Sequence, residues 1–488
     1  MAYYNIILAL TITPHTCKLP VKPENISEYE WKTTHIPRQE SVAGTEKFSG
    51  CLIYINLGTN ETESCDVFDY DKTWFQTTVP SDNNWVCENE INVANILAYS
   101  RIAELIGSFF FGWFGDLYGR KLTFIISIFM LVIGRFISIL TSSSLTFFTI
   151  GCIVAWFPSW SAPQSTAIIS LEISSSKRRA SVAKLKLVAT SLGMFLMPFF
   201  YWWLRNWQFF LIITTALQLP FLIFSWKLIE SPQWLWIKGR SRQTLKTLKY
   251  ISKINKTDLH SDTESEILTK SPSKANKTEV LGLLALLSSW RIVVTTMLQL
   301  LLWFAISLNY GVAVLSSGEK SEGNPFLDFA WQSLAEIPGF FVAAWLANSI
   351  GRRYTGIVSF SLTTTIWILY GLREISNTGW VRSEALDMFL VITNRASITV
   401  SYYLINLLNM ELYPTCLRQS GMSLGNLVSS GASAIAPYVL YLGRKVDVRC
   451  PSVILTATTL LGGIIPIFFL PETLNKKLPE TLEDAKNF

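Results

Sequence analysis

Charged residues and histidine are scarce in this chain of 488 residues. Asp, Glu, Lys and Arg make up 16% of the sequence, whereas hydrophobic residues make up 50%. A soluble surface of this size needs more charge, so the composition argues against a set of soluble domains. No GxxxxGKS or GxxxxGKT loop occurs, which argues against ATP-driven chemistry at such a loop. A histidine proton relay is not expected either, because the histidines all lie outside the long apolar runs: His15, His35 and His260.

Long apolar runs take up most of the chain after residue 93. Leu122 to Leu140 and Ile292 to Leu308 are examples. A helix needs about 20 mostly apolar residues to cross a hydrocarbon core of about 30 Å, because each residue adds about 1.5 Å. The sequence therefore predicts an all-α membrane protein with eleven complete spans, at residues 94–114, 122–141, 145–169, 182–204, 207–228, 290–315, 327–348, 354–372, 385–408, 417–442 and 452–470.

Met1 to Thr13 form a separate apolar segment. It is too short to cross the membrane, and it lacks the basic n-region and the small-residue cleavage site of a signal peptide. We interpret residues 1–13 as the remnant of a first helix whose beginning is missing. Together with the later spans, this segment indicates a twelve-helix plan with a truncated first helix.

Charge sets the expected orientation. Short basic loops such as Gly119-Arg120-Lys121 fall on one side, which the positive-inside rule assigns to the cytoplasm. Residues 18–93 contain thirteen acidic and six basic residues, a net charge of 6 − 13 = −7, and are expected on the outer side. The sequons at Asn25 and Asn60 agree, because glycosylation occurs only outside the cytoplasm. Residues 14–93 are thus predicted to form an extracellular, glycosylated loop.

Four of the seven cysteines lie in or beside this outer loop: Cys17, Cys51, Cys65 and Cys87. The oxidising compartment favours two disulfides among them, and three pairings are open. The remaining cysteines have no metal-ligand spacing, so no metal site is expected. Nothing in the sequence predicts a cofactor.

A basic segment at residues 237–289 separates two sets of spans. It carries ten basic and five acidic residues, and we expect a partly helical cytoplasmic linker near anionic lipid. A regulatory phosphorylation site is the weaker alternative. The linker divides residues 94–236, the rest of a first helical half, from residues 290–470, a second half. Residues 471–488 are the expected cytoplasmic tail.

Short motifs of the first half return in the second half at nearly constant offset. Gly119 recurs as Gly351, an offset of 351 − 119 = 232. Glu172 recurs as Glu411, at 411 − 172 = 239, and in each half an arginine follows seven residues later. Glu230 has its counterpart in Glu472, at 472 − 230 = 242. Duplication of one half is the economical explanation.

The repeated charges fall at predicted cytoplasmic helix ends. We expect them to form ion pairs between neighbouring cytoplasmic loops that must break when the cytoplasmic side opens. The alternative is that they are ordinary snorkelled charges that set topology. The residues of this predicted gating set are Gly112, Asp116, Gly119, Arg120, Glu172, Arg179, Gly351, Arg352, Glu411 and Arg418.

The segment Gly112 to Lys121 (GWFGDLYGRK) resembles the loop motif between the second and third helices of the major facilitator superfamily. Further motifs resemble the organic cation/anion transporter family of solute carriers, including its insect members. They are Glu230 to Leu235 (ESPQWL), Glu336 to Pro338 (EIP), Glu411 to Thr415 (ELYPT) and Leu470 to Thr473 (LPET). The chain departs from that family in its truncated first helix and in having four cysteines in the outer loop where six are usual.

The resemblance implies a major facilitator fold with two six-helix halves, and a plasma-membrane transporter rather than an enzyme. It implies transport of a small organic ion by alternating access, with a cation or a zwitterion favoured and without a nucleic-acid partner. A sugar or organic anion carrier of the same superfamily is the second reading. A third is a membrane binding or scaffold protein that does not transport.

Intramembrane charges are the first candidates for a substrate site, because they are costly in lipid. Glu336 is expected either to hold a cation or to pair with Arg395. Arg395 is itself a candidate substrate-binding residue, and the favoured alternative is that it only snorkels to the outer interface. Aromatic faces can hold an ammonium group, and Tyr310, Tyr402 and Trp303 are the candidates.

The resemblance places a charged residue of the family at Ser430, which is neutral here and therefore weakly favours a zwitterion or a cation bound mainly by aromatics. The other intramembrane charges are expected to be interhelical partners or interface anchors: Arg101, Glu104, Arg135 and Arg205.

Overall fold

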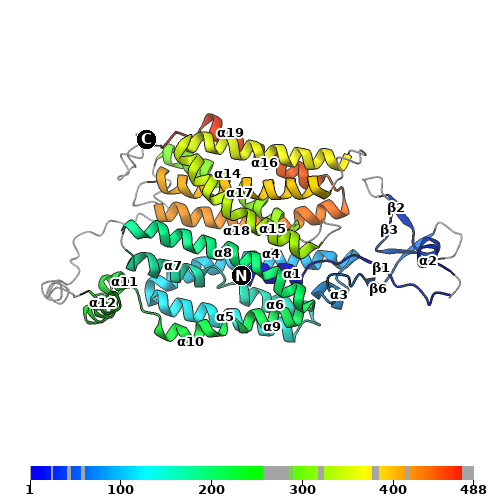
Figure 1. Ribbon diagram of the computed structural model, residues 1–488, viewed down its shortest axis with the longest axis horizontal. Coiled ribbons are helices and arrows are strands. Elements are labelled where there is room, and N and C mark those ends of the chain that lie inside the picture. Colours follow the sequence, from blue (N-terminus) through cyan, green and yellow to red (C-terminus); the bar gives the residue numbers. More distant parts are fainter. Residues whose placement is uncertain are drawn as a thin grey trace.

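In the computed structural model the chain forms two sets of long helices lying side by side, with a small strand-containing region at one end (Figure 1). The structure describes residues 2–23, 26–40, 46–55, 61–174, 176–257, 286, 289–316, 324–375, 384–413 and 418–474. The strand-containing region holds the acidic loop and lies at the end that the loop charges predict to be the outer side; α11 and α12 lie at the opposite end, predicted to be cytoplasmic (Figure 1).

The first half begins with a short helix and continues with long ones. Its elements are α1 (Ala2–Ala9), α4 (Ile91–Tyr118), α5 (Arg120–Leu140), α6 (Leu145–Trp156), α7 (Ser161–Ile173), α8 (Ser176–Leu204), α9 (Trp207–Ala216), α10 (Leu219–Phe224) and η2 (Ser225–Lys227). Pro158 lies in the break between α6 and α7, where a proline cannot supply a helical N–H. The Asn206 side chain accepts hydrogen bonds from the backbone N–H groups of Gln208 and Phe209 and so begins α9.

The second half follows two short cytoplasmic helices, α11 (Pro232–Ile237) and α12 (Ser241–Asn255). Asn324 caps α15 by accepting from the backbone N–H of Phe326. The long helices are α14 (Trp290–Leu315), α15 (Pro325–Ser349), α16 (Arg352–Ile375), α17 (Glu384–Leu412), α18 (Arg418–Lys445) and α19 (Cys450–Phe468).

Over the described residues, nine of the eleven predicted spans each fall on one long helix, whereas 145–169 is divided into α6 and α7 and 207–228 into α9, α10 and η2. Among the described residues, seven helical segments are both long and apolar enough to cross a membrane. Large apolar side chains such as Phe221 and Trp226 lie exposed on the outside of the helices. An apolar exterior of this kind suits lipid and not water.

The outer region is built from short elements. They are β1 (His15–Cys17), α2 (Glu28–His35), β2 (Arg38–Glu40), β3 (Glu46–Phe48), β4 (Leu52–Tyr54), β5 (Thr62–Ser64), β6 (Phe68–Tyr70), α3 (Val79–Asn83) and η1 (Cys87–Glu90). The strands form three antiparallel pairs, β1 with β6, β2 with β3 and β4 with β5. Strands of three residues bury little apolar surface, so this region needs covalent support.

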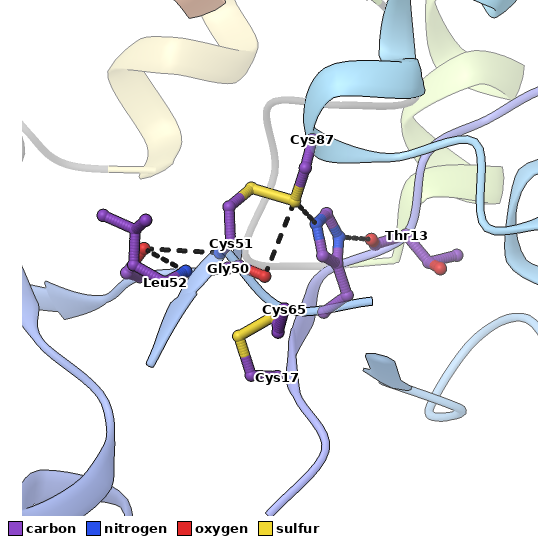
Figure 2. The surroundings of a disulfide bond; sticks show 9 residues. Thr13, Cys17, Gly50, Cys51, Leu52, Cys65 and Cys87 are labelled. Atoms are coloured by element: carbon purple, nitrogen blue, oxygen red, sulfur yellow. Dashed lines mark hydrogen bonds between the residues drawn. A yellow bond between two sulfur atoms is a disulfide. The ribbon is translucent and has the colours of Figure 1, made fainter. Parts of the chain in front are cut away.

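That support comes from two disulfides, drawn in Figure 2. Cys17 is bonded to Cys65, and Cys51 to Cys87, with Cα separations of 5.8 and 5.7 Å. The structure thereby selects one of the three pairings that the sequence left open. His15 lies beside the second bond, with Nε2 3.8 Å from the Cys87 sulfur. Because both sulfurs are joined, they provide no thiolate for a metal. The sequons Asn25 and Asn60 lie outside the described residues.

Candidate functional site

A buried carboxylate, Glu336, lies in the middle of α15 and is 4% exposed. Its Oε1 is 2.7 Å from Nη2 of Arg395 on α17. The hydroxyl of Tyr310, on α14, donates to the same oxygen at 3.1 Å. Three helices of the second half therefore meet at one carboxylate, as expected for a charge that must be compensated in a low-dielectric interior.

The other carboxylate oxygen of Glu336 is reached from the first half. Ser191, on α8, donates its hydroxyl to Oε2 at 3.4 Å. This serine was not among the predicted site residues, because a lone hydroxyl in an apolar helix carries no signal of its own. The contact places Glu336 at the boundary between the halves.

Arg395 does not reach the outer interface, so the expectation that it snorkels was wrong. The side chain is 2% exposed, and its guanidinium lies over the Tyr310 ring at 4.3 Å from the centroid. A guanidinium in lipid that lacks a counter-ion is very costly, and Glu336 together with the aromatic face offsets that cost. Burial in the bundle is therefore favoured over extension to the membrane surface.

The predicted aromatic residues form a chain next to this ion pair. The Tyr310 and Tyr402 rings are stacked at 6.2 Å, and Trp303 meets Tyr402 edge to face at 5.7 Å. Trp303 is fully buried and lies against Gly425 of α18, so it packs two helices together. Tyr310 contacts both buried charges, and Tyr402 stacks on Tyr310.

Ser430 is half-buried on α18, and its neighbour makes the contact with α14. The Ser307 hydroxyl donates to Ser429 at 2.7 Å.

Of the predicted substrate-binding residues, the structure brings together Glu336, Arg395, Tyr310 and Tyr402. It adds Ser191 to this group. The assembled groups can bind charge through a carboxylate, a guanidinium and aromatic faces.

Further contacts join the halves near their outer ends. Glu90, at the start of α4, pairs with Arg444 near the end of α18, with 2.6 Å between Oε1 and Nε. One turn farther into α4, the Tyr438 hydroxyl donates to Oδ1 of Asn95 at 2.9 Å. These contacts hold the outer ends of α4 and α18 together.

The described cytoplasmic charges form ion pairs within each half. Arg120 pairs with Glu172 at 3.9 Å in the first half. In the second half Arg352 pairs with Glu411 at 2.8 Å, and its Nε also donates to both carboxylate oxygens. The positions are equivalent in the two repeats, so the duplicated sequence motif corresponds to a duplicated ion pair.

Of the predicted gating set, the side chains of Asp116, Arg179 and Arg418 lie outside the described residues. Gly112 lies in open surroundings, where an added Cβ would meet no atom within 4 Å. The two remaining glycines, Gly119 and Gly351, have a structural role that was not predicted from the sequence.

A carboxylate caps the helix that follows each of these glycines. Glu230 accepts from the backbone N–H groups of Arg120 and Lys121, both at 3.1 Å. Gly119 has φ of 109°, a conformation that side-chain-bearing residues rarely adopt, and a Cβ there would collide with Glu230. Gly351, with φ of 92°, has the same role in the second half, because a Cβ there would collide with Glu472. A negative group at a helix N-terminus satisfies free N–H donors and is favoured by the helix dipole.

This chain is similar to known proteins in both sequence and fold. The family model described as Sugar (and other) transporter matches residues 57–484. An organic cation transporter protein of Drosophila melanogaster is 27% identical, over 97% of this chain and 86% of that protein. The human organic cation/carnitine transporter 2 is 24% identical, over 97% of this chain and 86% of that protein.

Among solved structures, the xylose transporter XylE from E. coli in a partially occluded inward-open conformation matches with a TM-score of 0.62. It is 17% identical and covers 80% of this chain and 90% of that one. This likeness establishes the fold. The relatives are transporters and not enzymes, in agreement with the sequence analysis.

Proposed function

Because this chain belongs to the Sugar (and other) transporter family and has the major facilitator fold, we propose that it carries a small organic cation or zwitterion by alternating access. The chain is a multi-pass membrane transporter, and its relatives favour organic ions as cargo. We place it in the plasma membrane. The cargo binds at Glu336, at the boundary between the halves.

The observation that supports this proposal is the pair of contacts on Glu336 that come from different halves. Oε1 is held by Arg395 within the second half, whereas Oε2 is reached by Ser191 of the first half. An ammonium group that binds Glu336 competes with both contacts. Since one contact spans the two halves, binding changes the relative stability of their arrangements, as a carrier requires.

The same residues suit a zwitterion. Glu336 offers a negative group, Arg395 offers a positive group, and Tyr310 provides an aromatic face beside both. A cargo with an ammonium and a carboxylate could exchange partners with this ion pair and leave the local charge balanced. Carnitine, in the name of one relative, has this chemistry.

A sugar carrier of the same superfamily is the second candidate, because the family description names sugars and the matched structure is a xylose transporter. A sugar carries no charge, however, whereas a charged cargo can exchange ion-pair partners with the buried carboxylate and guanidinium. The organic ion is therefore preferred.

Uptake into proteoliposomes tests the proposal. Labelled tetraethylammonium, L-carnitine, p-aminohippurate and xylose serve as probes of a cation, a zwitterion, an anion and a sugar. We expect saturable uptake of one of the first two, reduced about tenfold or more by Glu336→Gln, since a hydrogen bond to a charged group contributes about 1.5–3 kcal/mol. Glu88→Gln, an exposed acid at the outer end of the bundle, is the matched control.

Flux of every probe equal to that of empty liposomes would contradict transport and favour a binding or scaffold role. Uptake of xylose alone would select the sugar reading. Full cation or zwitterion uptake by Glu336→Gln would refute the site.

A further inference from the structure

A segment of the outer loop, residues 72–77, is fixed to the outer end of α8 in the first half. Arg205, which follows α8, donates from its guanidinium to the backbone carbonyls of residues 72–74. The Arg205 carbonyl accepts in turn from the backbone N–H groups of Gln76 and Thr77, at 2.8 and 3.3 Å. One residue at the end of α8 thus holds the segment through both its side chain and its main chain.

Two buried side chains of the first half continue this attachment. Tyr201 of α8 donates its hydroxyl to the carbonyl of Thr77 at 3.1 Å. The Trp207 indole, at the start of α9, donates to Oδ2 of Asp82 at 2.7 Å. Tyr201 and Trp207 are both fully buried. Because buried polar groups are costly to leave without hydrogen bonds, we expect residues 72–82 to move together with the first half.

Phe75, within this segment, also reaches the second half. Its ring centroid lies 5.4 Å from that of Tyr201 and 4.8 Å from that of Phe326. Phe326 is the second residue of α15, at the outer end of that helix. The Tyr201 and Phe326 rings are 5.6 Å apart, so the three rings contact one another. The outer loop, the first half and the second half each contribute one ring to this cluster.

The ring cluster is closed to solvent. Phe75 is 6% exposed, and Tyr201 and Phe326 are both fully buried. Separating the halves at this point would expose apolar ring surface to water, which is unfavourable. The cluster therefore favours the arrangement in which the outer ends of α8 and α15 lie together.

The ring cluster lies on the outer side of the candidate cargo site. Phe326 precedes Glu336 on α15 by 336 − 326 = 10 residues. Tyr201 follows Ser191 on α8 by 201 − 191 = 10 residues. At about 1.5 Å per residue, about 15 Å of each helix separates the cluster from the contact between Ser191 and Glu336. The cluster closes the outer end of the boundary that holds this contact at its middle.

Attachment of the loop does not by itself account for Phe75. The hydrogen bonds of Arg205 and Tyr201 already hold the segment, and they are made by backbone groups that any residue at position 75 would leave in place. The distinct contribution of the Phe75 ring is its contact with Phe326. That contact joins a segment fixed to the first half to a helix of the second half.

We propose that Phe75 is an outer gate residue that the loop carries with the first half. It packs against Phe326 when the outer side is closed and leaves Phe326 when the outer side opens. The consequence for transport rests on the proposed function. The outer loop thereby takes part in alternating access through one side chain, in addition to covering the first half.

Accessibility of a cysteine from outside tests the gate without any cargo. Asn95→Cys serves as the reporter, because it lies at the other outer boundary, between α4 and α18, and so reports opening of the whole outer side. Intact cells that express the full-length protein are labelled with a membrane-impermeant thiol reagent. The other cysteines outside the disulfides are removed by Cys152→Ser, Cys416→Ser and Cys450→Ser.

Phe75→Ala should increase the labelling rate about fivefold or more, since it removes an aromatic contact between the halves. Phe48→Ala is the matched control, because Phe48 is an aromatic residue of the outer region whose ring packs on Tyr29 of α2. It should leave the rate unchanged. Should Phe75→Ala fail to fold, Phe326→Ala removes the same contact from the other side and should increase labelling likewise.

Cross-linking tests which half carries Phe75. A short bifunctional maleimide joins Phe75→Cys to Phe326→Cys or, as the control, Phe75→Cys to Tyr201→Cys, in the same cysteine background. Counterflow of labelled L-carnitine and tetraethylammonium is then measured in proteoliposomes. The link to Phe326→Cys should abolish counterflow of the transported probe, whereas the link to Tyr201→Cys should leave it at the level of the same protein before cross-linking.

The outcomes separate the two proposals. Wild-type protein without counterflow of any probe refutes the proposed function, and the labelling assay still tests the gate. Unchanged labelling of Phe75→Ala or of its substitute Phe326→Ala overturns the gate and leaves the carrier intact. Counterflow that survives the link to Phe326→Cys also overturns it. Loss of counterflow with both links would show that the loop does not move with the first half, which contradicts the proposal as well.

Discussion

Glu472 caps the helix that begins at Arg352: its Oε1 accepts a hydrogen bond from the backbone N–H of Arg352 at 2.9 Å. Its Oε2 accepts from the N–H of Arg353 at 3.1 Å. The first half contains the same arrangement between Glu230 and the start of α5. The end of the last helix in each half is thereby tied to the third helix of that half, which makes each half a more rigid unit.

Loss of this cap should destabilise the protein. Glu472→Ala leaves backbone donors at the start of α16 without their partner, and we expect a cost of about 0.5–2 kcal/mol, as for other helix caps. Thermal unfolding of purified protein in detergent measures it. Glu88→Ala, an exposed acid, provides the control and should leave the midpoint unchanged. An unchanged midpoint for Glu472→Ala would show that water replaces the carboxylate without loss.

Glu472 should also contribute to the pH dependence of the protein's stability. Partial burial raises the pKa of Glu472, but four backbone N–H groups outweigh that effect and the pKa lies below its usual value. A carboxyl with a depressed folded-state pKa stabilises the protein above its unfolded pKa, and this contribution is lost as pH falls through the folded value. Stability should therefore drop in acid. Glu472→Gln should show a smaller drop over this range, and an identical acid profile for both proteins would contradict the assignment.

The buried pair of Glu336 and Arg395 should behave as a coupled unit. Arg395→Ala leaves a carboxylate in the bundle without its counter-ion, at an expected cost of about 3–5 kcal/mol. The double variant with Glu336→Ala removes both charges and should recover part of that loss. Unfolding of the single and double variants measures the coupling, and additive losses would show that the two residues do not stabilise each other.

The outer pair of Glu90 and Arg444 should bias the protein toward closure of its outer side. This ion pair is partly exposed, with side-chain exposures of 33% for Arg444 and 12% for Glu90. We expect it to contribute about 1 kcal/mol at most, a shift of about fivefold in the population with the outer side closed. Arg444→Ala should increase labelling of a cysteine placed at Asn95 by an external thiol reagent.

The charge-exchanged double variant, Glu90→Arg with Arg444→Glu, should return that labelling toward its original rate. Equal labelling in all variants would indicate that the ion pair is not part of the outer closure.

Several features followed from the sequence because they depend on local composition. The length of each apolar run predicts a spanning helix, and loop charge predicts its orientation. The repeat is visible because the Gly119 and Gly351 turns require glycine in both halves. Glu336 was selected by the same reasoning, since a carboxylate within an apolar run needs an explanation wherever it lies.

Other features were decided only when distant helix faces came together. Ser191 reaches Glu336 across 145 residues, and Tyr438 reaches Asn95 across 343. No local pattern encodes such contacts, because they depend on how two helices are rotated and placed against each other. The disulfide pairing and the inward position of Arg395 could not be predicted from the sequence for the same reason. The sequence determined which residues are costly to bury, and the tertiary structure decided which partners offset that cost.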